Sequence, residues 1–128
     1  MTTHVLTTQG PRLAVLSCAI RNSGAGWQLI NDVAHAPSGV SGVIQHPDHL
    51  EITHNVGAVR VSSLQVTPDE YYAARAVRCG ASVGLALTRI YLYKGTSTAP
   101  VDPATLVASS GNLWVTGLLE LPLATEGN

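Results

Sequence analysis

Two histidines flank a proline–aspartate pair at residues 46–49, and residues of these types could bind a metal ion. His46 and His49 could share a zinc ion with Asp48 or with His54. However, the spacing matches no standard metal motif, and Pro-Asp is common in ordinary turns. The sequence therefore favours a surface loop with solvated histidines over a metal site, and we predict neither a bound metal nor another cofactor.

The other titratable residues do not assemble into a recognisable catalytic motif. Asp32 and His35 could form an acid–base pair, but no G-x-S-x-G elbow identifies a nucleophile beside them. Asp69 and Glu70 are adjacent, so in a strand they would point apart, whereas paired-carboxylate hydrolysis needs two carboxyls that face one bond. We therefore predict a protein that is not an enzyme.

Aromatic and histidine side chains next to turns are candidates for contact with a ligand. Tyr71 and Tyr72 follow a turn sequence, and together with His46 and His49 they could contact a host surface glycan. Trp114 lies in an apolar segment, so we expect it in the core or at a subunit interface.

Composition restricts the class of protein. A chain of 128 residues indicates one domain. Charged residues make up only 12 % and apolar residues 45 %, with a net charge of −1, which argues against a nucleic-acid partner and favours burial of surface in an assembly. Apolar stretches are too short for membrane insertion, and the N-terminus does not resemble a signal peptide. Cys18 and Cys79 are expected as buried free thiols, although the sequence leaves their pairing open.

Short runs of Val, Ile, Leu and Thr between glycines and prolines predict an all-β, antiparallel β-sandwich. We expect the sandwich over residues 12–122, an N-terminal arm over 1–11 and a C-terminal tail over 123–128. The expected strands are 12–20, 27–32, 40–45, 50–54, 59–66, 78–94 and 111–122, and the segment 78–94 could be two strands joined by a turn at Thr88 and Arg89.

Two segments carry helix-capping signals. Thr67 and Glu70 match a capping box, with Pro68 at the first helical position, but strands on both sides favour a tight turn there. Asp102 and Pro103 predict a short helical turn over residues 102–106.

The first and last strands are apolar on both faces, which predicts that they are covered by a partner subunit. In the segment 111–122, Leu113, Val115, Leu119 and Leu121 alternate with Trp114, Thr116, Leu118 and Glu120. One face must line the sandwich core, and a lone small domain has little with which to cover the other. We therefore predict an oligomer interface formed by Trp114, Thr116, Leu118, Leu16 and Ile20.

Two resemblances extend this interpretation. The order of a covered first strand, several short strands and an apolar last strand resembles the jelly-roll domains of the C1q and tumour-necrosis-factor type. The segments WQLINDVAHAPSGV (27–40), SSLQVTPDEYYA (62–73), GASVGL (80–85) and DPATLVASSGNLWVTGLLEL (102–121) resemble small structural proteins of tailed bacteriophages, especially those of actinobacteria.

These resemblances imply a jelly roll whose first and last strands are neighbours in the inner sheet of a homotrimer. They also imply a non-enzymatic virion protein, assembled in the host cytoplasm, that contacts other capsid or tail proteins. It would act as a capsid decoration or head fibre, or as a tail-tip or fibre component. Two alternatives remain open, a carbohydrate- or receptor-binding adhesion module and a small metal-dependent hydrolase at residues 46–49.

Overall fold

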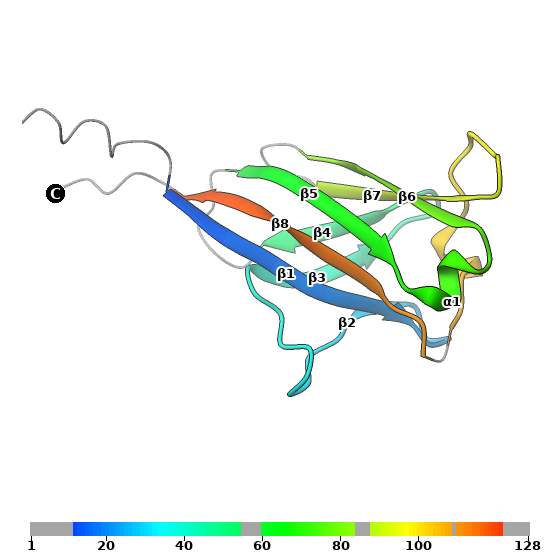
Figure 1. The fold of residues 1–128 in the computed structure, drawn as a ribbon, viewed down its shortest axis with the longest axis horizontal. Coiled ribbons are helices and arrows are strands. Elements are labelled where there is room, and N and C mark those ends of the chain that lie inside the picture. Colours follow the sequence, from blue (N-terminus) through cyan, green and yellow to red (C-terminus); the bar gives the residue numbers. More distant parts are fainter. Residues whose placement is uncertain (1–11, 55–59, 84–87, 109, 122–128) are drawn as a thin grey trace, which may run out of the picture.

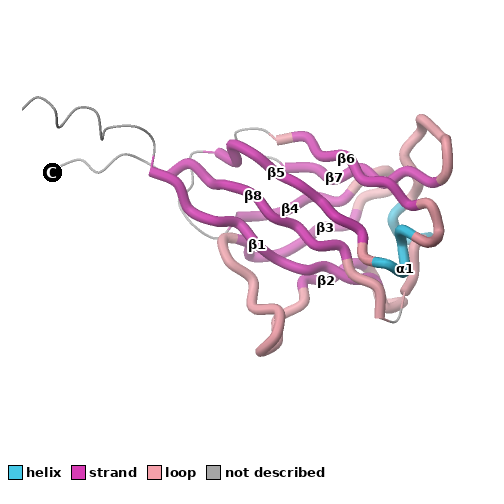
Figure 2. The backbone as a smooth tube through the Cα atoms, viewed as in Figure 1, coloured by secondary structure: helices cyan, strands magenta, loops and turns pink. Residues whose placement is uncertain are grey.

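The computed structural model describes residues 12–54, 60–83, 88–108 and 110–121, which form two antiparallel four-stranded sheets (Figure 1). The expected all-β sandwich is confirmed. The predicted arm 1–11 and tail 123–128 lie outside the described residues. Figure 2 shows that the strands make up the body of the molecule, whereas the short helix α1 lies at one end of it.

The first sheet has the strand order β2-β1-β8-β5, and the second has the order β3-β4-β7-β6. The first comprises β1 (Arg12–Asn22), β2 (Trp27–Leu29), β5 (Arg60–Pro68) and β8 (Leu113–Leu121). The second comprises β3 (Val40–Gln45), β4 (Leu50–His54), β6 (Val77–Ser82) and β7 (Thr88–Lys94). The strands β1 and β8 pair continuously from Arg12 opposite Leu121 to Ile20 opposite Leu113, so the first and last strands form the centre of one sheet.

The core lies between the two sheets and follows the two-residue period of the strands. The first sheet contributes the fully buried side chains of Leu16, Ile20 and Leu119. The second sheet contributes those of Leu50 and Ile90. Burial of one such side chain stabilises the fold by about 1.5–3 kcal/mol relative to its exposure. The opposite faces of the same strands are left for solvent or a partner.

The turn after β5 differs from the prediction. A single turn of α-helix, α1 (Glu70–Ala73), replaces the expected tight turn, and its N-cap is Asp69 rather than Thr67. One carboxylate oxygen of Asp69 accepts a hydrogen bond from the backbone N–H of Tyr71 at 3.0 Å, and the other accepts from the N–H of Asn112 at 2.6 Å. Asp69 therefore ties the helix to the start of β8, whereas Thr67 is an exposed residue of β5.

The predicted helical turn near residue 102 is confirmed as the 3₁₀ helix η2 (Pro103–Thr105). The Asp102 carboxylate accepts a hydrogen bond from the N–H of Ala104 at 3.0 Å. The segment 78–94 divides into β6 and β7, but the turn expected at Thr88 and Arg89 is wrong because β7 begins at Thr88. Residues 84–87, where the sequence predicted part of this strand pair, lie outside the described residues.

The two cysteines are free thiols in different sheets, Cys18 in β1 and Cys79 in β6. Burial raises the pKa of Cys18 to about 12 and that of Cys79 to about 11, since an apolar environment disfavours the thiolate. The expectation of buried free thiols is confirmed for Cys18, whereas Cys79 is free but only partly buried. Both have little nucleophilic character at neutral pH.

Candidate functional site

The first candidate site is the outer face of the β2-β1-β8-β5 sheet, where large apolar side chains project into solvent. Leu13 and Val15 of β1 are 55 % and 60 % exposed. Trp114 and Leu118 of β8 are 40 % and 37 % exposed, and Val15 lies directly opposite Leu118 in the ladder. We call these four residues the apolar strip. It occupies the two central strands of the sheet, where neighbouring side chains on one face contact each other.

Uncharged polar side chains adjoin the apolar strip. Thr116 lies between Trp114 and Leu118 on the same face of β8 and is exposed. On the neighbouring strand β5, Gln65 is paired with Thr116 and Thr67 with Trp114, and both are exposed. Hydroxyl and amide groups are far less costly to bury than charged groups once they are hydrogen-bonded. This surface is therefore suited to burial against another protein surface.

The segment between β2 and β3 borders the apolar strip near Trp114. The backbones of Ser17 and Ser38 exchange two hydrogen bonds of 2.9 and 2.7 Å, and the His35 ring lies 5.2 Å from the Trp114 ring. Asp32 accepts a hydrogen bond from Nδ1 of His35 at 2.8 Å, and this bond lowers the pKa of the Asp32 carboxyl. The Asp32–His35 pair suggested by the sequence thus exists, and its imidazole is held against a tryptophan.

Two of the five predicted interface residues lie elsewhere. Leu16 and Ile20 are fully buried inside the sandwich, so their assignment to a subunit interface is wrong. Since side chains alternate along β1, the face that points outward carries Leu13 and Val15, which the prediction missed. The signal that could identify them is the pairing of β1 with β8, because it places Val15 beside Leu118.

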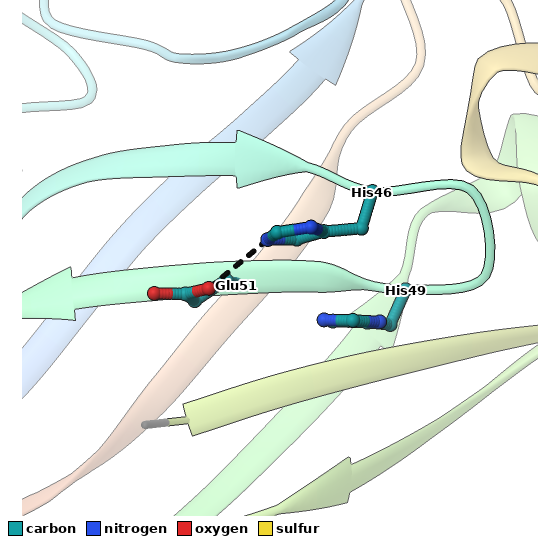
Figure 3. Close-up of side chains that lie close together, drawn as sticks. All are labelled: His46, His49 and Glu51. Carbon is teal, nitrogen blue, oxygen red and sulfur yellow. Dashed lines mark hydrogen bonds and ion pairs between the residues drawn. The ribbon is translucent and has the colours of Figure 1, made fainter. Parts of the chain in front are cut away.

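The second candidate site is the turn between β3 and β4, where His46 and His49 flank Pro47 and Asp48 (Figure 3). The N–H of His46 donates to the carbonyl oxygen of His49 at 2.9 Å and closes the turn. The two imidazoles stack, with ring centroids 4.4 Å apart and an angle of 14° between the planes. Figure 3 shows both rings extending along the hairpin on the side where Glu51 lies.

Glu51 completes a group of three possible metal ligands. It is the second residue of β4 and lies two residues after His49, which immediately precedes that strand. Its Oε1 atom is 3.0 Å from Nε2 of His46. One ligand atom from each of His46, His49 and Glu51 can be chosen so that all three lie within 4.8 Å of one another. The structure thus brings together two imidazoles and a carboxylate.

The partners that the sequence suggested for the histidines have other positions. Asp48 accepts a hydrogen bond from Nδ1 of His49 at 2.6 Å, and this bond lowers the pKa of the Asp48 carboxyl. His54 lies on the opposite face of β4 from Glu51, with its Nε2 atom 3.2 Å from Oγ1 of Thr88. Glu51 was missed because the sequence placed His49 in a turn and Glu51 in the following strand, and their proximity depends on how the hairpin closes.

The two tyrosines that were predicted to contact a ligand differ in exposure. Tyr72 is 1 % exposed, its ring stacks on Trp27, and its hydroxyl donates to the carbonyl oxygen of Leu106 at 3.2 Å. The expected ligand contact is therefore wrong for Tyr72, which caps one end of the core.

Tyr71 is half-buried and borders a hollow of about 190 Å³ that Arg75 and Lys94 also line. The guanidinium of Arg75 lies 3.7 Å from the centre of the Tyr71 ring and covers one of its faces. The ring is therefore only partly available for stacking on a ligand, and the two cations give the hollow a positive character.

In the described ranges there is no helix with the length and apolar character needed to cross a membrane. The candidate functional features among the described residues are the apolar strip, the histidine turn and the hollow beside Tyr71. Comparison with known proteins gave no relative, since no family model, no curated protein and no solved structure matches this chain.

Proposed function

We propose that this protein is a non-enzymatic structural subunit that assembles with copies of itself through the outer face of the β2-β1-β8-β5 sheet. The observation that carries the proposal is the apolar strip of Leu13, Val15, Trp114 and Leu118 at the centre of that face. Large apolar side chains gathered on one exposed face of a small protein mark an interaction surface. Thr116 lies among them, and Glu120 lies opposite Leu13 at one end of the apolar strip. The centre of the face is therefore one that a second copy can cover.

The finer proposal is a jelly-roll subunit of a bacteriophage virion that forms a homotrimer. Its support from the fold is the position of β1 and β8 as central neighbours of one of two four-stranded sheets. The C1q and tumour-necrosis-factor domains that the sequence resembles have this arrangement in the sheet that faces their threefold axis. Closed cyclic symmetry would let each apolar strip pack against its neighbours without leaving an open end.

Assignment to a virion rests on the segments that resemble small phage proteins, and the role remains that of a capsid decoration, a head fibre or a tail-tip component. Other virion proteins are then the expected partners. Mass spectrometry of purified particles tests for the chain directly, and its density in an image of the whole particle distinguishes capsid from tail. Absence of the chain from purified particles would refute the virion role without affecting self-assembly.

The oligomeric state is the primary test of the proposed assembly. A trimer of the 13.4 kDa chain has a mass of about 40 kDa, which sedimentation equilibrium separates readily from monomer and dimer. We expect a trimer at micromolar concentration. A stable, soluble monomer would contradict the proposal.

A receptor- or glycan-binding role is the second candidate, and the hollow beside Tyr71 is the observation that favours it. Arg75 and Lys94 would pair with the acidic groups of a host polysaccharide, and the Tyr71 ring, which lines the same hollow, would contact a sugar ring. Adsorption of the purified protein to host cells tests this role. It predicts that Lys94→Ala and Tyr71→Ala reduce adsorption, whereas the purely structural role predicts no adsorption by any variant.

A further inference from the structure

We infer that His46, His49 and Glu51 form a binding site for a divalent transition-metal ion of the zinc class. Imidazole nitrogens and a carboxylate oxygen are the ligands that zinc takes in proteins outside thiolate sites. Here three such groups come within 4.8 Å of one another on one face of a hairpin. The site lies on the second sheet, so the inference does not rest on the proposed assembly, and it replaces the sequence-based expectation of no metal.

The backbone fixes the positions from which the three ligand side chains extend. His46 and His49 face each other across a closed turn, and His49 and Glu51 are separated by one residue of a strand. Cross-strand neighbours on one face have Cβ atoms about 4.5–5.5 Å apart, which is within reach of a shared ion for imidazole side chains. Glu51 lies in β4, and the two histidines lie at the ends of a short turn that a backbone hydrogen bond closes, so all three ligands start from ordered backbone.

Asp48 gives His49 the tautomer and orientation of a metal ligand. Its Oδ1 atom lies 2.6 Å from Nδ1 of His49, so this nitrogen donates its proton to the carboxylate. The other ring nitrogen, Nε2, is then left with a free lone pair for a metal ion. Metal-binding histidines commonly donate their second ring N–H to a carboxylate in this way, and the carboxylate raises the basicity of the ring.

The contact between His46 and Glu51 has dimensions close to those of a metal site. Nε2 of His46 and Oε1 of Glu51 are joined by a hydrogen bond of 3.0 Å. Two ligands of one tetrahedral zinc ion, with bonds of about 2.0–2.2 Å, lie about 3.3–3.6 Å apart. A metal ion can therefore replace the hydrogen-bonded proton with a small movement. The stacked rings must tilt toward each other, which the broad χ2 preference of histidine permits.

Charges near the site favour a dication. Asp48 and Glu51 bring two carboxylates to the hairpin, while the cross-strand neighbour of Glu51 is the cation Arg89. The hydrogen-bond partner of Glu51 is His46, and the buried Nε atom of Arg89 has no hydrogen-bond partner among the described residues. Among the described residues no salt bridge joins Arg89 to Glu51, so the Glu51 carboxylate can exchange its contact with His46 for a metal ion. Water would supply the fourth ligand.

Calorimetric titration of the untagged, full-length protein with zinc chloride tests the site. We expect one equivalent of zinc to bind, with affinity weakened about 100-fold or more by His46→Ala, His49→Ala or Glu51→Gln. Asp48→Asn, which removes only the supporting carboxylate, should weaken binding by about 10–100-fold. Substitution by cobalt(II) provides a second readout, because tetrahedral coordination to nitrogen and oxygen gives visible absorption bands.

Matched controls use the histidines outside the cluster. His54→Ala and His4→Ala should leave zinc affinity unchanged, and the double variant His46→Ala/His49→Ala should keep the wild-type sedimentation behaviour. Zinc should raise the melting temperature of the wild type but not of the double variant. The inference is overturned if zinc does not bind saturably, if binding survives in the double variant, or if His4→Ala abolishes it.

Discussion

Replacement of Leu118 by aspartate is expected to abolish self-association without unfolding the subunit. Leu118 lies on the outer face of β8, is 37 % exposed and is paired with Val15 of β1 and Ser63 of β5. In an isolated subunit the new carboxylate can reach water, so the fold should be little affected. In an assembly that covers the apolar strip, the same carboxylate would be buried without a partner.

The magnitude of the effect can be worked out from the exposed fractions. The four residues of the apolar strip are 55, 60, 40 and 37 % exposed, which corresponds to the exposed surface of about two whole side chains. At about 1.5–3 kcal/mol per fully buried apolar side chain, complete burial contributes about 3–6 kcal/mol per subunit. Association costs about 4 kcal/mol or more in lost translational and rotational freedom. The apolar strip alone therefore only offsets this cost, and a stable trimer also needs the other contacts of the covered face. One buried charge, costing several kcal/mol, is then enough to separate the subunits.

The assay is sedimentation velocity over a range of micromolar concentrations, with circular dichroism as a check on folding. Ile44→Asp is the matched control, because Ile44 is 46 % exposed but lies on β3 in the other sheet. We expect the wild type and Ile44→Asp to sediment as the same oligomer and Leu118→Asp to sediment as a folded monomer. Equal dissociation of both variants, or an oligomer that tolerates Leu118→Asp, would refute the assigned interface.

Three further predictions concern stability and are measured by urea unfolding. Gly117→Ala should destabilise the fold by about 1–3 kcal/mol or more, because its Cβ atom would lie 2.3 Å from the carbonyl oxygen of Ser63; a neutral effect would show that β5 can move away. Asp69→Ala should lower the free energy of unfolding by about 2–4 kcal/mol through two lost hydrogen bonds, whereas Thr67→Ala should change it by no more than about 0.5 kcal/mol. A larger loss for Thr67→Ala than for Asp69→Ala would identify Thr67 as the helix cap. Burial lowers the pKa of His54 below its ordinary value of 6.5, so the unfolded chain takes up a proton at a higher pH than the folded one, and stability should fall as the pH drops below 6.5. His54→Gln should remove this dependence of stability on pH, and an unchanged dependence would assign it to another group.

The strands could be predicted where turn residues bound a clear apolar pattern. Residues 40–45 and 50–54 were predicted with the bounds that the structure gives, because Gly39 and the Pro47 turn delimit them. The end of β5 was predicted two residues too early. Pro68 cannot donate a ladder hydrogen bond and therefore suggested a turn, but β5 is an edge strand, where proline is tolerated.

The outward face of β1 could not be predicted because both of its faces are apolar. Leu13 and Val15 alternate with Leu16, Cys18 and Ile20, so periodicity alone does not say which set lines the core. Only the pairing with β8 decides between them. In contrast, β8 carries Thr116 among its outward residues, and for that strand the assignment of faces agrees with the observed exposure.

The polar contacts of the buried Asn22 were also missed, two of them within its own turn and one to a residue distant in the sequence. Asn22 is 2 % exposed, and its Oδ1 atom accepts hydrogen bonds from the N–H groups of Gly24 and Gly26 at 3.0 and 3.2 Å. Its backbone carbonyl accepts from the N–H of Ala108 at 2.8 Å. Turn composition alone predicted the bend near residue 24, but not the residue that organises it.

The apolar strip and the histidine turn belong to different sheets of the sandwich, which separates their roles. If the strip packs against other subunits, the outer face of the β3-β4-β7-β6 sheet is directed away from them. His46, His49 and Glu51 would then lie on the periphery of the assembly. A metal ion bound there by three protein ligands has its fourth position directed at solvent, where a donor from another protein can replace the water. Assembly and metal binding would therefore proceed independently, which is why the His46→Ala/His49→Ala and Leu118→Asp variants should each remove one property and leave the other intact.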